Sequence, residues 1–101
     1  MRILLHVTLP HEPFNTYVKD GSASAKMKRI LDDLKPEAAY FAEFDGHRGG
    51  ILIFDLQSAS QIPAAAEPWF ITFNADCHFH PVMLPEDLAK AGLDALGKKW
   101  A

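Results

Sequence analysis

The chain has 101 residues, of which 49% are apolar and 23% charged, and its formal net charge is −3. This composition predicts one globular domain, residues 1–101, and excludes a disordered chain. The net negative charge argues against nucleic acid as a partner. The sequence has no run of about 18 apolar residues that could cross a membrane. Its single cysteine excludes an internal disulfide framework, so we expect a cytoplasmic protein.

The first element, RILLHVTL at residues 2–9, alternates along its length. Its odd positions are all apolar: Ile3, Leu5, Val7 and Leu9. Successive side chains of a strand point to opposite faces, so the apolar face should meet helices, and His6 and Thr8 should lie on the uncovered, open face of a sheet. Because Pro10 ends the run and no small-residue cleavage site follows, the pattern predicts a strand rather than a secretion signal.

The next segment predicts two helical pieces. Phe14 and Tyr17 recur at helical spacing until Gly21 interrupts them. An apolar stripe then runs from Met27 toward Pro36, which the helix cannot pass.

Two β-rich runs, residues 37–44 and 50–56, flank the turn sequence DGHRGG and predict a hairpin. If the leucines and the phenylalanine of the second run face the helices, its other positions lie on the open face: Ile51, Ile53 and Asp55. We place Phe41 and Glu43 of the first run there as well. In the turn, Arg48 is a candidate for holding a substrate carboxylate, although such turns are more often only solvated.

The remaining segments predict a helix, a strand and a last helix. Residues 58–73 have one apolar helical face, with a kink or break expected at Pro68. CHFHPVM, residues 77–83, predicts the fourth strand, and residues 85–100 predict a helix that opens at Pro85 and closes near Gly97.

The order β-α-β-β-α-β-α predicts an α+β, ferredoxin-like βαββαβ fold with an extra C-terminal helix. Its four-stranded antiparallel sheet has the strand order 4-1-3-2 and carries helices on one face. Strands one and four are neighbours in this order, so His6, His78 and His80 should converge on the open face.

Three interpretations of these histidines stay open. Three imidazoles with a carboxylate could bind a metal, although an H-x-H pair is a weak signal, so we predict no metal or cofactor. The imidazoles could also line a pocket as acid–base groups, because histidine titrates near neutral pH. The simplest alternative is partly buried polar side chains at an interface between subunits.

The acid–base hypothesis assigns His6, His78, His80 and Glu43 as catalytic residues, with a carboxylate of Glu43 or Asp55 beside His6. Substrate would be bound by a wider set of residues: Thr8, Phe41, Ile53, Asp55 and Arg48. Cys77 lies on the opposite side of the fourth strand from His78, which indicates a core residue rather than a nucleophile.

The element order, the length and the segments DGHRGG and PVMLPEDLAKAGLDAL resemble those of small bacterial members of the dimeric α+β barrel superfamily. This superfamily includes proteins that look like muconolactone isomerase and the antibiotic-biosynthesis monooxygenases. The resemblance implies a homodimer in which two sheets meet face to face, with a pocket on each protomer.

The predicted function is therefore binding of a small organic molecule, with cofactor-independent isomerisation or monooxygenation by His-mediated proton transfer as the candidate reaction. The alternative is a non-enzymatic module that binds a metabolite or only assembles. Nothing in the sequence identifies the substrate.

Overall fold

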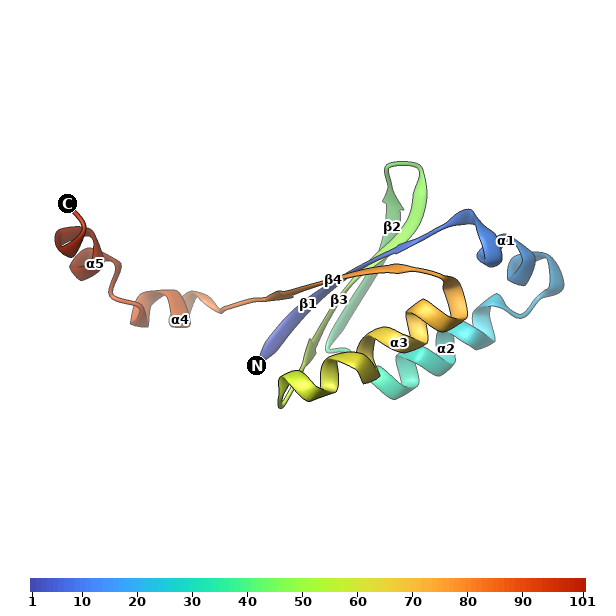
Figure 1. Ribbon diagram of the computed structural model, residues 1–101, viewed down its shortest axis with the longest axis horizontal. Coiled ribbons are helices and arrows are strands. Elements are labelled where there is room, and N and C mark those ends of the chain that lie inside the picture. Colours follow the sequence, from blue (N-terminus) through green and yellow to red (C-terminus); the bar gives the residue numbers. More distant parts are fainter.

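The computed structural model describes all 101 residues as a sheet covered by helices on one face, with a C-terminal arm that extends away from this body (Figure 1). The strands are β1 (Arg2–Leu9), β2 (Ala38–Phe44), β3 (His47–Asp55) and β4 (Asp76–Pro81). The helices are α1 (His11–Asp20), α2 (Ala23–Leu34), a short 3₁₀ turn η1 (Ala59–Gln61), α3 (Ile62–Phe73), α4 (Pro85–Lys90) and α5 (Leu93–Lys99).

The strand order is β2-β3-β1-β4, and every neighbouring pair is antiparallel. This order confirms the predicted ferredoxin-like α+β fold. The hairpin between β2 and β3 closes through the two residues Asp45 and Gly46, which both have positive φ values, 54° and 82°. Two positive φ values in succession are the geometry of a tight hairpin turn, and this turn fixes which residues of β2 share a face.

The hydrophobic core lies between the sheet and the helices. The odd residues of β1 are buried, and Leu5 is completely inaccessible to solvent. Trp69 and Phe73 of α3 are equally inaccessible, and the Phe73 ring contacts Phe14 and Tyr17 of α1. The apolar alternation of β1 therefore produces the helix-covered face that the sequence predicts.

The helices differ from the expectation in two places. Helix α3 has no break at Pro68, where a kink or a break is expected from the sequence. The last helix divides into α4 and α5 at Gly92, whose φ of 70° is left-handed, whereas Gly97 lies inside α5. Glycine adopts this conformation without steric cost, so a single Gly92 is enough to change the chain direction.

No helix is both long and apolar enough to cross a lipid bilayer.

Candidate functional site

His6 lies near the centre of the open face. Its strand, β1, is flanked on both sides, and its register partners are Ile51 on β3 and His78 on β4. The His6 and His78 ring centroids are 6.2 Å apart. His6 and His78 thus lie together on the open face, where the sequence placed them, while their chemical role stays a prediction.

An aromatic ring that the sequence analysis missed covers one side of His6. Phe44 of β2 lies edge-on to the imidazole, with ring centroids 4.6 Å apart and planes at 61°. The intervening residue on β3 is Gly49, and a Cβ placed there would meet the Phe44 ring at 2.5 Å. The missing side chain of Gly49 is therefore what lets Phe44 reach across β3 to His6.

The His6 side chain has a polar atom without a partner. Its Nε2 is buried and makes no hydrogen bond. A buried polar atom left unsatisfied costs about 1–3 kcal/mol, and such atoms in folded proteins call for an explanation such as a missing ligand or water. Because Nε2 is buried, a hydrogen-bonding ligand could satisfy it only if a neighbouring side chain such as Phe44 moved aside.

His80 and Thr8 occupy the rows on either side of His6. His80 is opposite Leu4, and Thr8 is opposite Asp76, which begins β4. Asp76 was missed because the predicted strand began one residue later; extending the alternation of His80 and His78 backwards by one step identifies it. Within the whole chain, no group of three or more His, Cys, Asp or Glu side chains could hold a metal ion, so the weak three-histidine metal hypothesis finds no ligand cluster here.

The prediction that Phe41 and Glu43 lie on the open face was wrong. Phe41 pairs with Gly50, which in turn pairs with the buried Val7, so Phe41 is on the helix-covered side. Glu43 Oε2 accepts a hydrogen bond from the Gly46 N–H, 2.7 Å away, and so closes the hairpin turn. Both faces of β2 carry apolar residues, and only the length of the turn decides which face is which.

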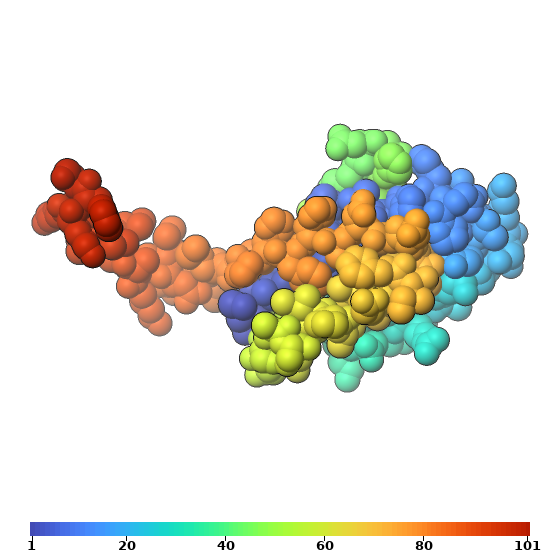
Figure 2. All heavy atoms as spheres, viewed as in Figure 1, coloured from blue at the N-terminus to red at the C-terminus, as the bar shows by residue number.

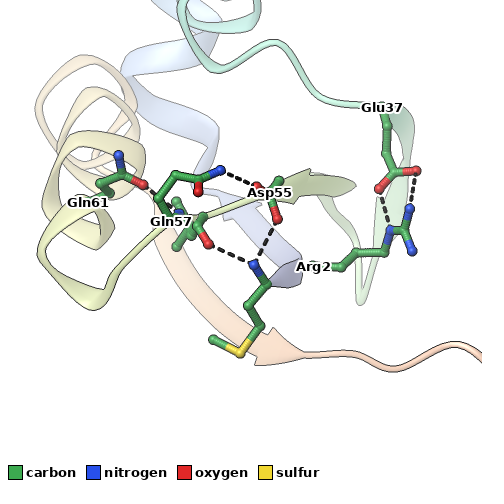
Figure 3. Close-up of polar contacts among 7 residues, drawn as sticks. Arg2, Glu37, Asp55, Gln57 and Gln61 are labelled. Atoms are coloured by element: carbon green, nitrogen blue, oxygen red, sulfur yellow. Dashed lines mark hydrogen bonds and ion pairs between the residues drawn. The ribbon is translucent and has the colours of Figure 1, made fainter. Parts of the chain in front are cut away.

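Asp55 lies on the open face but is too far along the sheet to pair with His6. Its register partner is Arg2, two rows from the row that His6 shares with Ile51. Asp55 accepts hydrogen bonds from the N-terminal amino group at 2.8 Å and from Gln57 Nε2 at 2.6 Å (Figure 3). The expected carboxylate beside His6 is therefore supplied neither by Glu43 nor by Asp55, whereas Ile53 lies on the open face as predicted, opposite Leu4.

Arg48 lies on the helix-covered side, away from His6. Its Nη1 donates a hydrogen bond to Asn15 Oδ1 at 2.8 Å, and the guanidinium lies 4.6 Å from the centre of the Phe14 ring. It borders a hollow of about 380 Å³ that is otherwise mainly apolar, lined by Leu9, Phe14, Met27, Phe41, Ala42 and Gly49. Arg48 and His6 therefore cannot contact the same small ligand within one chain.

Cys77 is half-buried on the helix-covered side, opposite Val7. Burial raises the pKa of its thiol to about 11, and the negative charge of neighbouring Asp76 adds to the rise. The thiol is un-ionised at neutral pH, which agrees with a packing role and opposes a nucleophilic one.

No protein-family model and no curated protein sequence matches this chain. Among solved structures, the fold is similar to that of 5-chloro-2-hydroxyhydroquinone dehydrochlorinase (TftG) from Burkholderia phenoliruptrix AC1100, solved in complex with 2,5-dihydroxybenzoquinone. The TM-score is 0.60 at 14% sequence identity, and the match covers 86% of this chain and 98% of TftG. At this identity the similarity establishes the shared fold.

Proposed function

We propose that this chain forms a homodimer through the open faces of its sheets and binds a small organic molecule beside His6. Proton transfer by His6 would give it the activity of a cofactor-independent isomerase or monooxygenase. The observation that carries the proposal is the His6 imidazole: it lies centrally on the open face, is bordered by Phe44 and His78, and has a buried Nε2 without a partner.

The apolar side chains of the open face support the proposed homodimer. Apolar side chains surround His6 on this face without being buried: Leu4, Tyr40, Ile51 and Ile53. Exposed apolar surface of this kind is typical of an interaction site, and one face of an antiparallel sheet often needs a cover. A second sheet would exclude water from His6 and create the enclosed, mostly apolar space that small ligands prefer.

The chemistry follows from the groups around that space. A neutral imidazole presents one ring nitrogen as an acceptor, which can remove a proton from a substrate hydroxyl or an acidic carbon. His78 provides a second imidazole that can hold or return the proton, and Thr8 can donate a hydrogen bond to a substrate oxygen. The fold neighbour's ligand, a small planar quinone, is the kind of molecule that Phe44 could stack against.

A ligand titration tests the proposal. We expect 2,5-dihydroxybenzoquinone, used as a probe, to shift the NMR signals of His6, Phe44 and Ile51, and the variant His6→Gln to bind it at least tenfold more weakly. His11→Gln is the matched control, because His11 lies in α1, outside the sheet, and stacks with His47 near the hairpin turn.

Two results would overturn the proposal. One is equal binding by His6→Gln and the control across a panel of small quinones, phenols and enolisable acids. The other is a set of shifted signals confined to Phe14 and Met27, which would move the binding site to the hollow beside Arg48.

The alternative, a non-enzymatic module, keeps the same binding surface. It predicts that the probe binds but that no product forms, and that no C–H bond of the bound compound exchanges its proton with solvent deuterium. Exchange that depends on His6 would support the enzymatic form of the proposal.

A further inference from the structure

The C-terminal arm, residues 82–101, makes the molecule strongly elongated. Its principal extents are 60 × 29 × 20 Å and its radius of gyration is 17.2 Å, compared with about 13 Å for a compact chain of 100 residues. Figures 1 and 2 show α4 and α5 projecting from the end of β4, clear of the helices that cover the sheet. Beyond Val82, whose N–H bonds to the Arg2 carbonyl, the arm therefore does not pack on the helices of its own chain.

The arm nevertheless carries the apolar side chains of a packed element. Its large apolar residues are 43% to 77% exposed: Met83, Leu84, Leu88, Leu93, Leu96 and Trp100. Leu84 and Leu88 are four residues apart, and Leu93, Leu96 and Trp100 follow at spacings of three and four, so each helix has one apolar face. Helices of six and seven residues are not stable alone in water, so both need a surface to pack against.

The charge of the arm indicates which kind of surface the two helices could pack against. It has three acidic side chains, Glu86, Asp87 and Asp94, and three basic ones, Lys90, Lys98 and Lys99. A helix that binds a membrane surface or nucleic acid is typically rich in basic residues, and this arm is balanced. The balance fits an uncharged, partly apolar protein surface.

The path of the chain points to a second copy as the owner of that surface. The last bond to the sheet runs from the Val82 N–H to the Arg2 carbonyl, after which the arm leaves along the direction of β4. β4 borders the open face, so a copy that covers the open face would lie next to the arm.

We propose that residues 82–101 form an exchanged arm, in which Leu88, Leu96 and Trp100 of each chain pack on the body of a second copy. A two-fold axis makes the exchange reciprocal and buries both arms at once. The proposal goes beyond the ligand site and rests on the proposed function only for the existence of a dimer.

The test uses the full chain. In a dimer mixed from isotope-labelled and unlabelled copies, we expect nuclear Overhauser contacts from the Trp100 ring and the Leu88 methyls to surface residues on the body of the other copy. We also expect the backbone amides of α4 and α5 to be protected from hydrogen exchange. The double variant Leu88→Asp, Leu96→Asp should lose this protection and raise the dimer dissociation constant at least tenfold.

The matched control is the double variant Glu86→Gln, Lys98→Gln, which alters two polar positions of the same helices and should keep both the protection and the dimer. Arm contacts found only within one chain, or arm amides that exchange freely in a stable dimer, would overturn the exchanged arm while leaving the proposed function intact. If the quinone titration failed but intermolecular arm contacts were present, the proposed ligand site would be overturned and the exchanged arm would stand.

Discussion

The two faces of the sheet are built from alternate residues of the same strands, yet only one of them is covered by other parts of the chain. Leu5 points into the helical layer and is fully buried, whereas its neighbour Leu4 points to the open face and is only partly buried. The helix-covered face is completed within one chain. The open face combines apolar side chains with an unpartnered imidazole, which indicates that its complement comes from outside the chain.

The sharpest contrast should come from truncating the two neighbouring leucines. Leu5→Ala leaves a cavity in the core and should lower the free energy of unfolding by about 2–5 kcal/mol. Leu4→Ala should lower it by roughly 1 kcal/mol or less in the isolated chain. Urea unfolding at low protein concentration measures both, and equal losses would contradict the division of the sheet into a closed and an open face.

Gly49 is the glycine at which an added side chain would meet the closest neighbours. A Cβ at this position would meet the Phe44 ring at 2.5 Å and the Val7 carbonyl oxygen at 2.7 Å. Gly49→Ala should therefore cost about 1–3 kcal/mol of stability and shift the His6 ring signals as Phe44 moves away. In Gly97→Ala, where no heavy atom lies within 4 Å of the new methyl group, stability should stay the same or rise slightly.

Removing the hydroxyl groups of two tyrosines compares the two sides of the sheet again, with a smaller expected change in stability. Tyr17 Oη donates a hydrogen bond to the Thr72 carbonyl at 2.9 Å and ties α1 to α3. Tyr17→Phe should lower the free energy of unfolding by about 0.5–1.5 kcal/mol. Tyr40→Phe, on the exposed edge of the open face, should leave it unchanged, and a loss in thermal denaturation similar to that of Tyr17→Phe would be inconsistent with this account.

How well the sequence predicts which side chains lie on which face differs between the strands. In β1 one face is wholly apolar, so the sequence identifies the buried side and the place of His6 without ambiguity. In β2 both faces are apolar, and the side on which Phe41 and Glu43 lie is decided by a two-residue turn whose length the alternation pattern does not reveal.

Other features depend on contacts between distant parts of the chain. Asp55 binds the N-terminus, 54 residues away in sequence, and no local pattern predicts that pairing. The arm is helical, as the sequence predicts, but its leucines are exposed, and no local pattern reveals what would cover them.

The effect of the Cys77 thiol appears only in alkaline solution. Because folding raises the pKa of this thiol from its ordinary value of 9.0 to about 11, the unfolded chain loses its proton first as the pH rises. The stability that this thiol contributes is therefore complete below about pH 9 and decreases between about pH 9 and pH 11.

Thiol labelling at pH 8 should accordingly be slow in the folded protein and fast in urea. Asp76→Asn removes the secondary cause of the shift and should accelerate labelling modestly. Rapid labelling of the folded protein would place Cys77 on an accessible surface and contradict its position opposite Val7.

Sedimentation equilibrium of the wild-type protein and of Ile53→Asp tests most directly whether a second copy covers the open face. Ile53 lies on that face, one row from His6, so a buried carboxylate there would oppose pairing of the two sheets. We predict the mass of two chains for the wild type and of one chain for the variant at the same concentration. A wild type that stays at one chain, or a variant that stays at two, would contradict the account.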